Sequence, residues 1–163
     1  MEIERKFLIK ELPCNLDAYQ CLLIEQAYLN TDPVIRIRKQ DDTYYLTYKG
    51  KGLMAREEYN LPLNKEAYHH LLKKADGNII TKKRYLIPIE NPSFSDHYVP
   101  LHGPVELTVE LDIFHAPFAP LNIAEVEFPS EEMANAFLPP PWLGEDVTND
   151  TAYHNSTLSQ KIF

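Results

Sequence analysis

The sequence is poor in the residues that build covalent frameworks and membrane spans. Its two cysteines, Cys14 and Cys21, form no disulfide framework and are typical of reduced thiols in the cytosol. No apolar run approaches the roughly 20 residues of a transmembrane helix. Charges among the first six residues argue against a cleaved signal peptide. We therefore expect a soluble, cytoplasmic protein with no membrane partner.

An excess of positive charge is also missing, because 16 Lys and Arg residues stand against 24 Asp and Glu residues and the formal net charge is -8. This balance argues against a general nucleic-acid binder, which needs a basic surface. The few glycines form no Walker-type phosphate loop, and the six histidines show no metal-ligand spacing. Without repeats or a linker, the chain is expected to form one domain over residues 1–163.

Alternation of apolar and polar residues, the pattern of β-strands, dominates the sequence. Helices are few and short: one follows the capping residue Asn64, one follows Ser130, and one lies near residues 151–160. The fold class is therefore mainly β, of the α+β type. Eight strands are expected, at residues 2–10, 22–30, 33–40, 43–50, 54–62, 79–89, 105–114 and 121–129.

Charged residues recur two positions apart along these strands, and their signs segregate. Glu2, Glu4 and Lys6 share one side of the first strand, whereas Arg36 and Arg38 share one side of the third. Like charges placed in this way lie roughly 7 Å apart and repel each other. One explanation is an antiparallel sheet with a solvated polar face. The alternative is a closed barrel whose charged sides converge on a ligand in its lumen.

The segregation of signs favours the lumen. A solvated face gains from opposite charges across strands and loses from like charges. Clustered Arg and Lys side chains inside a barrel would need a multiply charged anion, and clustered carboxylates would need divalent cations. A polyphosphate meets both needs, because guanidinium groups bind its oxygens and Mg²⁺ or Mn²⁺ binds carboxylate and phosphate oxygens together.

An N-terminal motif, Glu2-x-Glu4-x-Lys6, resembles the ExExK signature of the CYTH, or triphosphate tunnel metalloenzyme, superfamily. Residues 26–29 resemble its second strand and residues 146–150 its C-terminal stretch, so the resemblance covers nearly the whole chain. The charged positions follow in the order of that family: Arg36-x-Arg38, Lys49, Arg56-x-Glu58, Lys82-x-Arg84, Glu110-x-Asp112 and Glu125-x-Glu127.

The resemblance implies a closed eight-stranded antiparallel β-barrel, a tunnel with a few short flanking helices. It also implies one or two Mg²⁺ or Mn²⁺ ions as cofactors. The implied phosphate ligands are Lys6, Arg36, Arg38, Lys49, Arg56, Lys82 and Arg84. The implied metal-binding or water-positioning residues are Glu2, Glu4, Glu110, Asp112, Glu125 and Glu127, of which Glu2 and Glu4, with Lys6, are also taken as catalytic. Further candidates are Glu58, Tyr28 and Lys161. Asn60 departs from the Arg-x-Glu-x-Glu of many members and cannot supply a full negative charge.

On this resemblance the leading hypothesis is metal-dependent hydrolysis of the terminal phosphate of a triphosphate, with inorganic tripolyphosphate as the substrate. The alternatives are cyclisation of ATP to cyclic AMP and pyrophosphate, as in class IV adenylate cyclases, hydrolysis of thiamine triphosphate, and polyphosphate binding without catalysis. The many carboxylates argue against a pure anion binder, which would be better served without them. A homodimer formed through an outer face of the barrel is a further expectation.

Overall fold

The computed structural model describes all 163 residues of the chain. The strands of the main sheet are β1 (Glu2–Ile9), β2 (Gln20–Thr31), β3 (Val34–Gln40), β4 (Thr43–Lys49), β5 (Ala55–Arg56), β6 (Glu58–Leu63), β7 (Asp76–Ile89), β9 (Leu107–Phe114), β10 (Asn122–Glu127) and β12 (Leu143–Asp146). The remaining elements are β8 (Ser93–Phe94), β11 (Phe137–Leu138), α1 (Lys65–Leu72), α2 (Glu131–Ala136), α3 (Asn155–Ser159) and the 3₁₀ turns η1 (Leu16–Ala18) and η2 (Thr151–Tyr153). None of the helices has the length and apolar character needed to cross a membrane.

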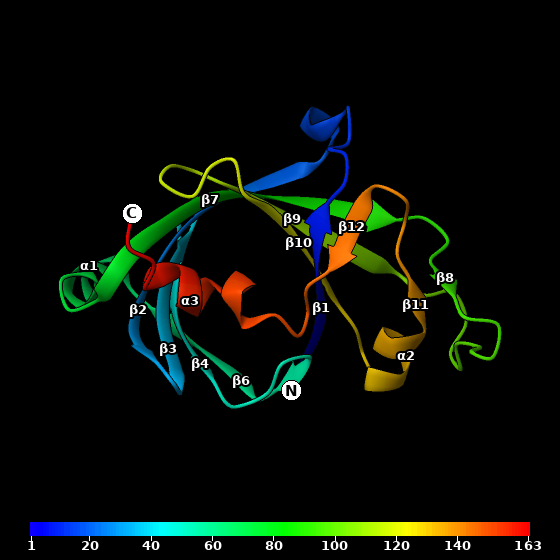
Figure 1. The fold of residues 1–163 in the computed structure, drawn as a ribbon. Coiled ribbons are helices and arrows are strands. Elements are labelled where there is room, and N and C mark those ends of the chain that lie inside the picture. Colours follow the sequence, from blue (N-terminus) through cyan, green and yellow to red (C-terminus); the bar gives the residue numbers. More distant parts are fainter.

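The strands follow the order β12-β1-β10-β9-β7-β2-β3-β4-β6, and β5 pairs back onto β1. This last pairing brings the two ends of the sheet together into a nearly closed antiparallel barrel (Figure 1). The predicted barrel is therefore confirmed, with two differences. The predicted strand at residues 54–62 is broken at Glu57 into β5 and β6, and β12 was not predicted. β12 occupies the part of the β1 edge that β5 leaves free.

Cross-strand register brings the charged positions of different strands onto one side of the sheet. Lys6 lies opposite Glu125, Glu125 lies opposite Glu110, and Arg84 lies opposite Asp112. Residues that face each other across a ladder point their side chains to the same face. The charged sides of these strands therefore run round the inside of the barrel, and the alternate residues face outward.

Apolar side chains on the outer face of β1, β9 and β10 are covered by α2, β8 and β11. Phe7, Val109 and Val126 are at most 1% exposed and belong to one apolar cluster with Phe137 of β11. Full burial of each such side chain contributes roughly 1.5–3 kcal/mol. The layer therefore fixes which side of these strands faces outward, and so directs their charged side chains inward.

The helices expected after Asn64 and Ser130 are present, and both begin at the predicted caps. The Asn64 side-chain oxygen accepts a hydrogen bond from the backbone N–H of Ala67 at 2.7 Å. The Ser130 hydroxyl accepts one from the N–H of Met133 at 3.1 Å. Tyr68 of α1, which is completely buried, packs against outward-facing residues of β2 and β3. The sequence signals for helix starts were therefore sufficient here.

One end of the barrel interior is apolar rather than charged. Tyr28, Val34, Phe114 and Ile123 pack there with Leu158 of α3. The helix predicted near residues 151–160 is present as η2 followed by α3. Figure 1 shows this C-terminal segment lying across the opening of the barrel. The segment thereby limits the space left for the charged side chains.

Candidate functional site

The charged side chains line a cavity of about 390 Å³ inside the barrel. Only three of its 20 lining residues are hydrophobic, whereas most small-molecule pockets are predominantly apolar. The predicted site residues that line the cavity are Glu2, Glu4, Lys6, Tyr28, Arg36, Arg38, Lys49, Arg56, Glu58, Arg84, Glu110, Glu125 and Glu127. A cavity of this size and composition suits a small, highly charged ligand.

Arg36 and Arg38, at successive inward positions of β3, form what we call the cationic wall. The Arg38 guanidinium donates two hydrogen bonds to the side-chain oxygen of Gln26, at 2.6 and 3.0 Å, and one to the Tyr45 hydroxyl at 3.3 Å. All of these acceptors are neutral. Burial lowers the pKa of Arg38, and the neighbouring charges of Arg36 and Arg84 lower it further. The positive charge of Arg38 is therefore not cancelled within the protein.

Two guanidinium nitrogens near the cavity have no hydrogen-bond partner. Arg36 donates to the Thr47 hydroxyl at 3.0 Å through one terminal nitrogen, but its Nε is buried and unpartnered. The Nε of Arg56 is also buried and unpartnered, and lies 3.6 Å from Glu2 Oε1, beyond hydrogen-bonding distance. A buried donor without an acceptor costs about 1–3 kcal/mol. A rotation of either guanidinium toward the cavity would let an anion there supply the missing acceptor.

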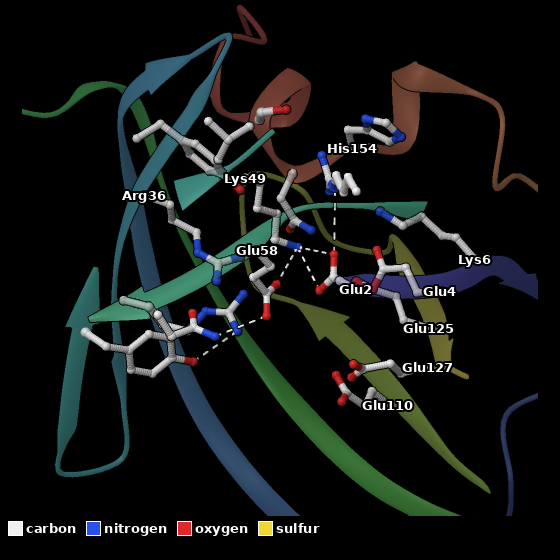
Figure 2. A pocket seen from close by; sticks show the side chains of 18 of the residues that line it. Glu2, Glu4, Lys6, Arg36, Lys49, Glu58, Glu110, Glu125, Glu127 and His154 are labelled. Carbon is white, nitrogen blue, oxygen red and sulfur yellow. Dashed lines mark hydrogen bonds and ion pairs between the residues drawn. The ribbon is translucent and has the colours of Figure 1, made fainter. Parts of the chain in front are cut away.

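A group of carboxylates faces the cationic wall, and Figure 2 shows them together on the opposite side of the cavity from Arg36. This acidic wall consists of Glu4, Glu110, Glu125 and Glu127. Burial and the charge of Glu125 raise the pKa of Glu4 to about 8. Burial and the charge of Glu110 raise the pKa of Glu127. Burial also raises the pKa of Glu125, but the charges of Lys6, Arg84 and Lys82 together outweigh burial, so the pKa of Glu125 is lowered well below its ordinary value.

The donors of the acidic wall fit a hard divalent cation. Carboxylate oxygens are the ligands that Mg²⁺ and Mn²⁺ prefer, and a cation would relieve the repulsion that raises the pKa values of Glu4 and Glu127. The structure gathers no three acidic, histidine or cysteine side chains into a complete metal site. Mg²⁺ usually needs only one or two carboxylates, because substrate phosphates and water complete its shell.

A third group joins β1, β4 and β6. The Lys49 ammonium lies 2.8 and 3.1 Å from the two carboxylate oxygens of Glu2 and 3.3 Å from Glu58, as the dashed lines in Figure 2 show. Burial and a hydrogen bond with Glu58 raise the pKa of Glu2 to about 7. For Glu58, burial is outweighed by the hydrogen bond from Glu2 and the charge of Lys49, and its pKa is lowered to about 2. Glu58 is thus the ionised member of this pair of carboxyl groups.

Two predicted ligand-binding residues pair with each other instead of facing the cavity. Lys82 Nζ lies 2.6 Å from Asp112 Oδ2, and both side chains are 0% exposed. Asp112 also accepts hydrogen bonds from Arg84 at 2.7 and 2.8 Å. Their place next to Phe114 at the apolar end of the barrel explains the difference, because charges buried there need partners within the protein. Lys82 and Asp112 therefore do not line the cavity, and Asp112 pairs with both Lys82 and Arg84.

A third predicted residue, Lys161, is exposed and lies outside the cavity. Its ammonium lies 5.2 Å from the centre of the Phe163 ring. Its backbone oxygen accepts a hydrogen bond from the Asn78 side chain at 2.7 Å. The position of Lys161 follows from the end of α3 turning outward onto β7, so its charge does not reach the barrel interior.

The family model described as CYTH domain matches residues 1–154. The chain belongs to this family. It is 35% identical over 164 residues to the inorganic triphosphatase of Nitrosomonas europaea, with 99% of this chain and 98% of the relative covered. It is 34% identical over 166 residues to the inorganic triphosphatase of Acetivibrio thermocellus, with 96% and 92% covered. A solved structure described as an inorganic triphosphatase has a TM-score of 0.68 and 33% identity, and the match covers 99% of this chain and 96% of that one.

This CYTH barrel also places residues in the cavity that the charge pattern did not single out. Histidine spacing predicted no role for His154, yet it lines the cavity at the start of α3. Burial and the charges of Lys6 and Arg56 lower its pKa to about 4, so its ring is neutral at pH 7. No local pattern predicts this position, because it depends on the C-terminal segment folding into the barrel.

Asn60, the departure from the family pattern, lines the cavity on its exposed side. Its side-chain oxygen accepts a hydrogen bond from the Thr47 hydroxyl at 2.6 Å, and its nitrogen donates to Glu58 at 3.1 Å. Because Thr47 in turn accepts from Arg36, a single chain of hydrogen bonds runs from Arg36 to Glu58. Strand alternation places Asn60 and Glu58 on the same side of the strand, so the position of Asn60 in the cavity could be predicted from the sequence.

Proposed function

We propose that this CYTH protein hydrolyses the terminal phosphate of inorganic tripolyphosphate with the help of Mg²⁺ or Mn²⁺. The observation that carries the proposal is the pairing of two opposed walls in one small cavity: uncancelled guanidinium charge on one side and crowded carboxylates on the other. The names of the two curated relatives, both inorganic triphosphatases, support the same reaction.

In the proposed complex the phosphate chain lies between the walls. Arg36 and Arg38, which line the cavity, bind its oxygens through their guanidinium N–H groups. Lys6, Lys49 and Arg56 add positive charge from β1, β4 and β5. These fixed charges are oriented before the substrate arrives, so they stabilise the charge that develops on the transferred phosphoryl group.

The reaction needs no covalent intermediate on the protein. A water oxygen bonds to the terminal phosphorus while the bridging P–O bond breaks, which releases orthophosphate and pyrophosphate. The water proton passes to a carboxylate of the acidic wall. Glu4 and Glu125 would hold the divalent cation with phosphate oxygens, and Glu2 and Glu127 are the further candidates. The bound ion would neutralise phosphate charge and lower the pKa of water.

The proposal is tested by incubating the protein with tripolyphosphate, ATP or thiamine triphosphate, with and without Mg²⁺ or Mn²⁺, and identifying the products. We expect metal-dependent release of orthophosphate and pyrophosphate from tripolyphosphate. Cyclic AMP with pyrophosphate as the preferred products would identify a cyclase instead. No turnover of any of the three in the presence of metal would favour a polyphosphate-binding protein without catalysis.

The role of the acidic wall is tested with Glu4→Gln, which keeps the shape of the side chain and removes its charge. We expect this variant to lose metal-dependent turnover and to keep the circular dichroism spectrum of the wild type, because Glu4 faces the cavity and not the apolar layer. The matched control is Glu66→Gln, at an exposed position of α1. Activity of Glu4→Gln close to that of the control would contradict the role of the acidic wall.

A further inference from the structure

Gln26 lies behind the cationic wall and is 0% exposed. Both ends of its amide are used. The oxygen accepts two hydrogen bonds from the Arg38 guanidinium, at 2.6 and 3.0 Å, and the nitrogen donates to the Tyr28 hydroxyl at 3.2 Å. These contacts fix the orientation of the amide, because the reverse orientation would place its NH₂ group against the guanidinium.

We propose that Gln26 is a positioning residue that holds Arg38 toward the phosphate chain without cancelling its charge. The proposal rests on the proposed function, in which the cavity binds a polyphosphate. The two hydrogen bonds to Gln26 use the Nε and one terminal nitrogen of Arg38, and Gln26 is fully buried outside the cavity lining, to which Arg38 belongs. The other terminal nitrogen contacts Tyr45, a residue of the cavity lining. The guanidinium is thus held by neutral acceptors while it lines the cavity.

The choice of an amide at this position matters because of its charge. A glutamate at position 26 could accept the same two hydrogen bonds, and the buried ion pair would be stronger than the neutral contact. It would also place a negative charge beside Arg38, in a region where charges interact over several ångströms with little screening. A phosphate would then meet a neutral pair instead of a cation. A neutral partner therefore secures the geometry of Arg38 and leaves its charge for the ligand.

The experiment compares Gln26→Glu, Gln26→Met and the control Gln20→Glu. Gln20 lies at the exposed start of the same strand and outside the cavity, so Gln20→Glu adds the same charge without touching Arg38. Calorimetry measures the binding of tripolyphosphate to each protein without metal, thermal unfolding gives Tm, and steady-state kinetics with Mg²⁺ separates kcat from KM.

For Gln26→Glu we expect binding at least about 10-fold weaker than in the control, a raised KM, and a Tm equal to or above that of the wild type, because the new carboxylate pairs with Arg38. For Gln26→Met we expect a lowered Tm, because the guanidinium loses its acceptor. A Gln26 that served packing alone would give a different result: binding loss would follow the loss of Tm in both variants.

Binding by Gln26→Glu within about 2-fold of the control, or a Tm as low as that of Gln26→Met, would overturn the proposal. The comparison of binding and Tm among the Gln26 variants does not depend on whether the protein hydrolyses tripolyphosphate. If wild-type protein binds tripolyphosphate but does not hydrolyse it with Mg²⁺ or Mn²⁺, the proposed function fails while the comparison of Gln26 variants still decides the role of Gln26.

Discussion

Arg38 and Arg84 lie on inward positions of neighbouring parts of one barrel, and both are less than 9% exposed, yet the groups around them differ in charge. Arg38 donates to the neutral oxygens of Gln26 and Tyr45. Arg84 donates to Asp112, Glu110 and Glu125. The pKa of Arg38 is lowered by burial and by other cations, whereas the pKa of Arg84 is raised, because carboxylates outweigh its burial.

The difference separates charge that holds the barrel together from charge that is available to a ligand. Around Arg84, carboxylates of the protein pair with the positive charges, and the fully buried pair of Lys82 and Asp112 is one of these ion pairs. Around Arg38 no carboxylate accepts a hydrogen bond, so burial of the cation costs stability until an anion enters. A bound polyphosphate should therefore stabilise the cationic wall by mass action, in addition to being held by it.

The largest expected effect is on stability, at the ion pairs around Arg84. Asp112→Asn removes the charge that compensates both Lys82 and Arg84, and leaves cations buried with a weaker partner. We expect the free energy of unfolding to fall by about 3–5 kcal/mol, measured by urea denaturation without metal. The control Asp42→Asn, in the exposed turn between β3 and β4, should change stability by less than about 0.5 kcal/mol. Equal stability of the two variants would mean that the buried charges are not matched as described.

The next effect separates the two arginines directly. Arg38→Met should lower kcat/KM for tripolyphosphate by roughly 10- to 150-fold, the equivalent of one hydrogen bond between charged groups. It should cost much less stability than Arg84→Met, because the removal of a buried cation that has no ion pair offsets the loss of the donors to the buried Gln26 oxygen. Arg84→Met should instead destabilise the protein, since Glu110 and Glu125 lose the guanidinium that pairs with them and Asp112 keeps only Lys82.

Steady-state kinetics and urea denaturation of both variants provide the measurement. The proposed difference between the two arginines is contradicted if Arg38→Met costs as much stability as Arg84→Met, because Arg38 would then be a structural residue. It is also contradicted if Arg38→Met keeps the wild-type kcat/KM.

The sequence predicted which residues face inward better than it predicted which of them line the cavity. Alternation along a strand is a local property, so Arg36, Arg38 and Glu125 were placed on the inward side without knowledge of the barrel. Lys82 and Asp112 obey the same alternation. Their mutual pairing, however, depends on the register between β7 and β9 and on the apolar end of the barrel interior beside them. The register between two strands that are distant in sequence cannot be predicted from either strand alone.

The same limit explains the other differences. β5 and β6 share one alternating stretch, and only the position of β1 shows where the strand breaks. Gln26 carries no charge and is buried, so a search for charged positions passes over it even though strand alternation places it beside Tyr28. His154 reaches the cavity because a C-terminal segment folds back across the barrel opening, which no pattern near His154 indicates.

The third prediction concerns pH and the acidic wall without metal. The pKa of Glu4 is about 8 in the folded protein and has its ordinary value of 4.5 when unfolded. Between these values the folded state binds more protons, so the contribution of Glu4 to stability is complete below pH 4.5 and falls as the pH rises toward 8, by at most about 1.4 kcal/mol per pH unit. The stability of wild type minus that of Glu4→Gln, measured by urea denaturation from pH 5 to about 8, isolates this term.

Saturating Mn²⁺ should reverse this trend, because the ion binds the ionised carboxylates and its affinity rises as they lose protons. A stability difference that is flat between pH 5 and 8 without metal would show that Glu4 is not held in an environment that disfavours its charge. Titration of His154 and Lys82 is common to both proteins, so it cancels in the difference.

The smallest expected effect adds a second negative charge beside Glu58, in the hydrogen-bond chain that leads to Arg36. Asn60→Asp preserves the acceptor for the Thr47 hydroxyl, but replaces the N–H that Glu58 accepts with a second carboxylate oxygen. Because Asn60 is exposed, solvent screens the repulsion to about 1 kcal/mol and the fold should be unaffected. We expect tripolyphosphate to bind the metal-free variant about 5-fold more weakly than it binds Asn15→Asp, an exposed control outside the cavity. Tighter binding of the anion by Asn60→Asp would show that the cationic wall does not depend on neutral partners, and that the contrast between Arg38 and Arg84 has another cause.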